Sequence, residues 1–147
     1  MALRNAFENL ATDESLKLVH SSQTDGSQKT KVVPASGGGL SVYRNISLGT
    51  SGITIKSSPG QIYGWFLFNK SSAVRYVKLY NKASNPTVGL DTPFMTIPLP
   101  AGGGANVNFT SGITFTKGIG VGATTGASDG DTGAPAANDV IVNVIYY

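Results

Sequence analysis

The stretch after residue 40 most constrains the fold, because it consists of short strand-like runs separated by glycine and proline turns. Such turns fall at residues 58–60, 85–86 and 100–104. The connections are too short for the crossover helices that a parallel sheet needs. We therefore predict an all-β domain over residues 40–147, an antiparallel β-sandwich of jelly-roll or immunoglobulin-like order. The expected strands are 41–48, 52–56, 61–69, 73–81, 93–99, 105–110, 112–123 and 138–147.

Residues 1–39 differ in character from the rest of the chain. Leu3, Phe7 and Leu10 recur at spacings of four and three, which predicts a short amphipathic helix. Residues 20–39 are polar, with Pro34 and three successive glycines, and only Val32 and Val33 interrupt them. This composition predicts an extended N-terminal arm with a short helix, followed by the sandwich domain.

Two of the expected strands are apolar on both faces. Residues 61–69 place Ile62, Gly64, Phe66 and Phe68 on one face and Tyr63, Trp65 and Leu67 on the other, and residues 140–147 follow the same pattern. A sandwich strand with one wet face alternates apolar and polar residues, so something must cover the second face here. We predict a homo-oligomer, most simply a homotrimer, whose subunit interface contains Trp65, Leu67, Ile141, Ile145 and Tyr147.

The net charge of +3 is unevenly distributed. Residues 41–90 hold six basic residues and no acidic one. Within them we predict a basic docking patch of Arg75, Lys78 and Lys82 that meets acidic patches on a partner. A nucleic-acid site would cluster its bases among stacking aromatic residues more densely, so no nucleic-acid partner is expected.

No membrane partner is expected either. No apolar run approaches the ~18 residues that a membrane span needs, and the N-terminal sequence lacks the apolar core of a secretory signal. We expect synthesis in a cytoplasm.

The residues that usually perform catalysis are scarce. The chain has no Cys and one His, His20, in the polar arm, and three of the candidate acids lie in one Gly/Ala-rich loop, a poor support for a rigid pair. We expect a non-enzymatic protein without cofactor or metal, with a glycan hydrolase as the weaker alternative. Asp129 and Asp131 fit Asp-Gly turns, and a calcium loop there stays open.

The glycines at every second position of residues 118–122 do not form a phosphate-binding loop, since no Gly-Lys-Ser/Thr sequence opens a helix. Such alternation predicts a strand against which another backbone or a large aromatic ring packs closely.

Residues 43–147, some 105 of the 147, resemble a class of small virion proteins of tailed bacteriophages. The resemblance rests on IYGWFLFN (62–69), RYVKLYNK (75–82), DTPFMTIPLPAGG (91–103) and the final NDVIVNVIYY (138–147). RNAFENLATDESL (4–16) is similar to N-terminal segments of phage structural proteins that dock onto a neighbouring component.

This resemblance implies a structural role in the virion. We expect a capsid decoration (cement) subunit that binds the phage major capsid protein at the capsid surface. Its arm would contact neighbouring capsid subunits through Leu3, Phe7, Leu10, Val32 and Val33. The alternative is a tail, collar or head-fibre component, with Trp65 and the tyrosines available to stack on sugars.

Overall fold

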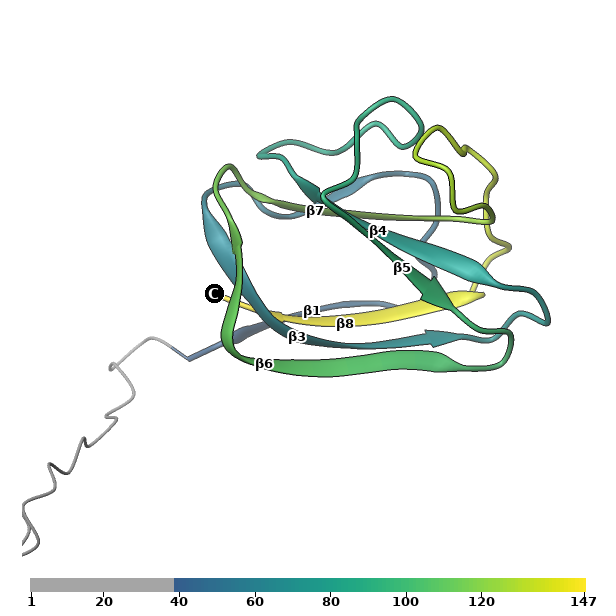
Figure 1. Cartoon of the computed structure of the whole chain (residues 1–147), viewed down its shortest axis with the longest axis horizontal. Helices are drawn as coiled ribbons and strands as arrows, with labels where there is room; N and C mark the ends of the chain where they lie inside the picture. Colours follow the sequence, from purple (N-terminus) through teal and green to yellow (C-terminus); the bar gives the residue numbers. More distant parts are fainter. Residues whose placement is uncertain (1–38) are drawn as a thin grey trace, which may run out of the picture. The chain divides into compact units, whose positions relative to one another are not determined.

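The computed structural model describes residues 39–147, which form eight strands and no helix. The strands make two four-stranded antiparallel sheets that pack face to face (Figure 1). The prediction of an all-β, sandwich-like domain is confirmed, while the arm and its short helix lie outside the described residues apart from Gly39. The strands are β1 (Ser41–Asn45), β2 (Ile53–Lys56), β3 (Gly60–Asn69), β4 (Arg75–Asn81), β5 (Met95–Leu99), β6 (Gly104–Phe115), β7 (Ile119–Thr124) and β8 (Val140–Tyr146).

The strand order follows one simple rule. One sheet has the order β1-β8-β3-β6 and the other β2-β7-β4-β5, so β1 pairs with β8, β2 with β7, β3 with β6 and β4 with β5. These four antiparallel pairs form one long double-stranded ribbon that is folded over into two layers. In the immunoglobulin order the first two strands pair with each other. Here β1 and β2 belong to different sheets.

The core lies between the sheets and is built by alternation along each strand. Val140, Val142 and Val144 of β8 point inward, as do Val77 and Leu79 of β4, and all five are almost fully buried. Every second side chain of a strand faces the same side, so the inward set of each sheet meets that of the other. Core packing therefore fixes which residues each sheet presents on its outer face.

The edge strands have features that suit their positions. Pro98 lies in β5, which pairs only with β4, and a proline that cannot donate to a ladder is tolerated at such an edge. The two strands predicted over 105–110 and 112–123 divide differently, because β6 continues to Phe115 through Gly112 at φ 71°. Glycine adopts this left-handed conformation without steric cost.

Candidate interaction surface

The two sheets differ in what covers their outer faces. The outer face of β1-β8-β3-β6, the lower layer in Figure 1, is uncovered among residues 39–147. It exposes Phe66 and Phe68 at 44% each and Val42 at 64%. The partly exposed Ile141 and Ile145 complete the set, and we call these five residues the outer apolar face.

The register places these side chains side by side. On neighbouring strands, Phe68 lies opposite Ile141 and Val42 lies opposite Ile145. Between these pairs runs a row of Arg44, Asn143, Phe66 and Asn106. Phe66 lies diagonal to both Ile141 and Ile145 and so connects the two apolar pairs across this polar row. Exposed apolar residues elsewhere on a protein are commonly scattered singly.

A bulge in β3 determines which residues face outward. Ile62 pairs with Tyr146 of β8, but Gly64 pairs with Ile145, so β3 contains one extra residue between these pairs. Such an insertion moves every later side chain to the opposite face. The prediction that Ile62 and Phe66 share one face is therefore wrong.

The same bulge places two predicted interface residues inside the domain. Trp65 and Leu67 point into the core and are only 6% and 2% exposed. Trp65 packs edge-on against Phe109, with ring centroids 5.3 Å apart. Neither residue is available to a second subunit, and Trp65 cannot stack on a sugar. Phe66 and Phe68 face outward from β3 in place of Trp65 and Leu67, which the sequence pattern predicts at the interface.

The other three predicted interface residues remain accessible. Ile141 and Ile145 belong to the outer apolar face, and Tyr147 is 61% exposed just beyond β8. The Tyr147 backbone exchanges two hydrogen bonds with Gln61, and the Lys56 ammonium lies 5.3 Å from the centroid of the Tyr147 ring. Tyr147 is thus held to the start of β3.

The predicted basic docking patch does not form. Lys78 is fully buried and its Nζ donates to the Ser128 carbonyl oxygen. Arg75 donates from Nε and Nη2 to Asp139 Oδ2 at 3.0 and 2.9 Å. Lys82 pairs with Asp91. The prediction is corrected because these cations bind groups of their own domain.

The Lys82–Asp91 pair affects the titration of the acid. The side-chain hydrogen bond from Lys82, followed by the Thr87 backbone N–H at 2.6 Å, lowers the pKa of Asp91. Lys82 and Asp91 line an open pocket of about 230 Å³. The other lining residues are Tyr80, Asn81, Thr92 and Lys117. Since Lys82 and Asp91 pair with each other, Lys117 is the one remaining charged side chain among the described residues that line this pocket.

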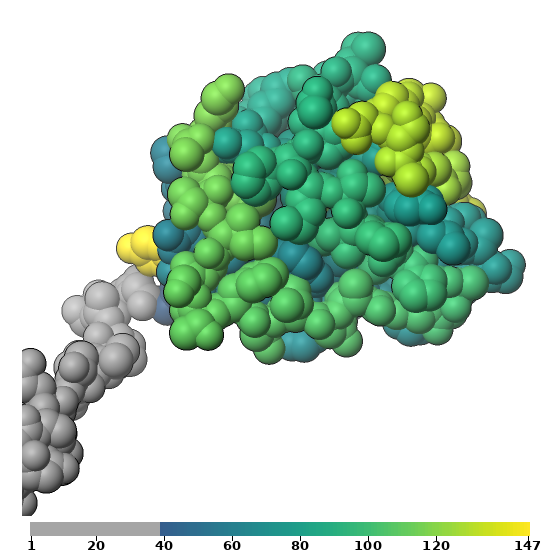
Figure 2. All heavy atoms as spheres, in the orientation of Figure 1, coloured from purple at the N-terminus to yellow at the C-terminus, as the bar shows by residue number. Residues whose placement is uncertain are grey.

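The outer face of β2-β7-β4-β5 is covered by loops. Pro86 and Val88 lie over Gly120 and Gly122, which sit beside the Tyr80 side chain. A Cβ on Gly122 would come within 2.7 Å of Val88 Cγ2. The predicted close approach to this glycine-rich strand is therefore confirmed. In Figure 2 the yellow-green loop before β8 packs on the teal loop after β4, in agreement with the contact of Gly89 and Thr132.

Burial of Tyr80 beneath these loops changes its titration. Desolvation, with smaller effects of Asp91 and Asp129, raises the pKa of Tyr80 to about 12. Its hydroxyl has no hydrogen-bond partner among the described residues.

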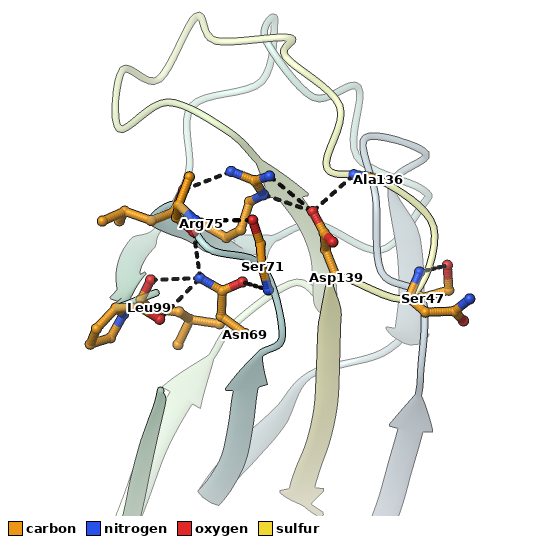
Figure 3. Close-up of polar contacts among 11 residues, drawn as sticks. Ser47, Asn69, Ser71, Arg75, Leu99, Ala136 and Asp139 are labelled. Atoms are coloured by element: carbon orange, nitrogen blue, oxygen red, sulfur yellow. Dashed lines mark hydrogen bonds and ion pairs between the residues drawn. The ribbon is translucent and has the colours of Figure 1, made fainter. Parts of the chain in front are cut away.

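The loops at one end of the domain are tied together by two polar side chains (Figure 3). Asn69 Nδ2 donates to the carbonyl oxygens of Ala73, Leu99 and Pro100, and its Oδ1 accepts from the Ser71 N–H. Asp139 Oδ2 accepts from Arg75 and from the Ala136 N–H. Both side chains link segments far apart in sequence, so they fix the shape of this end.

The Asp129–Asp131 segment forms a turn. Asp131 Oδ1 accepts from the backbone N–H groups of Gly126 and Gly133 at 3.1 and 3.0 Å. This is the turn-forming role that the Asp-Gly sequence favours. Among residues 39–147 no three His, Cys, Asp or Glu side chains come together as metal ligands.

The predicted arm contacts Leu3, Phe7, Leu10, Val32 and Val33, like His20, lie outside the described residues. Over the part of the chain that is described, no helix is long and apolar enough to cross a membrane. Searches with this chain against protein-family models, curated proteins and solved structures find no match.

Proposed function

We propose that this protein is a non-enzymatic structural subunit of a virus particle, most simply a decoration subunit on the capsid of a tailed phage. The observation that carries the proposal is the outer apolar face. Two phenylalanines and a valine, each more than two-fifths exposed, lie on a regular sheet beside two isoleucines. Contiguous apolar patches of this kind mark sites of protein contact.

The strand order supports this proposal. The orders β1-β8-β3-β6 and β2-β7-β4-β5 are those that we assign to a jelly roll, a fold that viral capsid proteins use alongside lectins and cupins. Fold alone does not determine function. The strand order gains weight here because it agrees with the phage-like segments of the sequence, which overlap β3, β4, β5 and β8.

The mechanism that we propose is mechanical. The loops tied by Asn69 and Asp139 give a rigid domain that loses little entropy when it docks. The outer apolar face supplies burial of hydrophobic surface between copies of the subunit, which is oligomeric. The partner on the particle is the major capsid protein, which Leu3, Phe7, Leu10, Val32 and Val33 contact.

The proposal is tested by adding the purified full-length chain to particles of the virus that encodes it, prepared without this protein. Saturable co-sedimentation in a fixed number of copies per shell is expected, together with a higher temperature of particle rupture. Absence of the chain from purified wild-type particles, or failure to saturate, would contradict it. If the bound chain is labelled in electron micrographs and the label lies only on the tail, collar or a head fibre, the alternative location is supported.

A further inference from the structure

We propose that the outer apolar face binds the same face of a second copy of this chain. The inference deepens the proposed assembly role and rests on it, because it names the partner of that surface. Val42, Phe66, Phe68, Ile141 and Ile145 would stack across a two-sheet interface of the kind that already joins the two sheets within the domain.

The charge of this face favours a copy of itself. Across the rows set by the register, Arg44 on the edge strand β1 is the only charged residue of the outer face. A strongly charged partner protein could form an ion pair with Arg44 alone on this face. A second copy meets no strong repulsion, because the single arginine lies at the border and its long side chain can reach water.

The polar residues of the face are also self-complementary. Asn143 lies at the centre of the face. On β6, Asn106 lies opposite Phe66 of β3, and Asn108 lies opposite Gly64. Within the domain Asn143 Nδ2 donates to the Phe66 carbonyl oxygen and Asn106 Oδ1 accepts from the Leu67 N–H. The Oδ1 of Asn143 and the Nδ2 of Asn106 can therefore pair with the same groups of a second copy.

The spacing along β8 suits a two-fold axis. Ile141 and Ile145 stand two residues to either side of Asn143 on that strand. A two-fold axis across the strands at Asn143 therefore sets Ile141 of one copy against Ile145 of the other. Contacts of this isologous kind are the commonest in homo-oligomers.

The area of the face lies near the lower limit of a specific interface. Four strands about 4.8 Å apart, of five, seven, ten and twelve residues at ~3.3 Å per residue, give a face of roughly 500 Å² in projection. The relief of the two phenylalanines increases the accessible area. Specific interfaces begin at about 600 Å² per partner, so the whole face must be used, which a flat sheet against its own copy allows.

The test measures the mass of the purified full-length chain by sedimentation, with no particles present. We expect an oligomer that the double variant Phe66→Thr/Phe68→Thr dissociates to the 15.2 kDa monomer. Both positions are exposed and threonine favours strands, so the variant should keep its fold. Circular dichroism and thermal melting of the variant check this. Leu90→Ser, which removes an 85%-exposed leucine from a loop on the other sheet, is the matched control and should stay oligomeric.

A dimer that the double variant dissociates supports the inference. A trimer overturns it, because a three-fold ring does not place identical faces against each other. A wild-type monomer at micromolar concentration overturns it, since residues 1–38 or another protein would then occupy the face. An oligomer that the double variant leaves intact overturns it as well. Particle binding by a monomeric wild-type chain would refute this inference alone and leave the proposed function standing.

Discussion

Phe68 of β3 and Ile141 of β8 lie directly opposite each other and both point away from the core. Cross-strand apolar pairs stabilise a sheet by burying part of each other's surface, but here a large remainder stays in contact with water. The pair therefore serves two purposes: it supports the sheet locally and contributes to a surface that another protein can cover.

The Arg75–Asp139 pair should stabilise the loop end of the domain. Its side chains are only 14% and 16% exposed, and charge-assisted hydrogen bonds of this geometry are stronger than neutral ones. Arg75→Met should lower the free energy of unfolding by about 1–3 kcal/mol, because it leaves the Asp139 carboxylate partly buried without its cation. Urea denaturation measures the change.

Two further variants make this test specific. Arg44→Met, at an exposed position of β1, should change stability by less than about 0.5 kcal/mol. A double-mutant cycle with Asp139→Asn should give a coupling energy above about 0.5 kcal/mol. Additive effects of Arg75→Met and Asp139→Asn would show that the pair is not coupled.

Gly122 should be intolerant of a side chain. A Cβ there lies 2.7 Å from Val88 Cγ2, so Gly122→Ala must push the covering loop away, at a cost of about 1–3 kcal/mol. Gly49→Ala is the control, because its Cβ would meet nothing within 4 Å. Thermal melting compares the two, and equal stabilities would mean that the loop does not rest on β7.

Tyr80 should make the domain sensitive to alkali. Its pKa of about 12 in the folded state lies above the ordinary value of 10.0, so the folded state keeps a proton that the unfolded state releases. Stability therefore falls as the pH rises from about 10 to about 12. Tyr80→Phe should melt at the same temperature as wild type or higher near neutral pH, because the Tyr80 hydroxyl has no hydrogen-bond partner among residues 39–147.

The Tyr80→Phe variant should also lose less stability than wild type above about pH 10. Tyr63→Phe is the comparison, since the Tyr63 hydroxyl donates to Gln61 Oε1 at 2.6 Å, and it should lower stability by about 0.5–1.5 kcal/mol at neutral pH. An identical alkaline loss in wild type and Tyr80→Phe would contradict the assignment.

Asp91 should contribute to the loss of stability in acid. Its pKa is lowered in the folded state by Lys82 and the Thr87 N–H, so its contribution is present above the unfolded pKa of about 4 and is lost as the pH falls through the lower folded value. Asp91→Asn keeps an oxygen that can accept from Thr87 but removes the charge. Between about pH 5 and about pH 3, its melting temperature should therefore fall less than that of wild type.

The control for the acid experiment is Thr92→Ala, at an exposed neutral position next to Asp91. Between about pH 5 and about pH 3, the melting temperature of this control should fall as much as that of wild type. If Asp91→Asn also follows the wild-type profile, the Lys82–Asp91 pair does not couple to folding.

The strands and the glycine-rich β7 could be predicted from the sequence because both depend on local pattern. Alternation and turn residues located β3 and β8 within two residues of their ends, and the small residues at positions 118–122 indicated the close approach of Tyr80, Pro86 and Val88. These signals lie within a single segment, so they need no knowledge of distant partners.

The faces of β3 and the state of the basic residues could not be predicted in the same way. The bulge after Ile62 is defined by pairing with β8, some eighty residues further along the chain, and it exchanged Trp65 and Leu67 for Phe66 and Phe68. Lys78 is buried because Ser128, fifty positions away, folds over it. Both outcomes depend on tertiary contacts that a one-dimensional pattern does not contain.

The most direct test of the assembly role is a density map of the virus particle at a resolution that shows side chains. The account predicts copies of this sandwich on the particle, with Phe66 and Phe68 buried against protein. A map in which the outer face of β1-β8-β3-β6 points into solvent in every copy would contradict it.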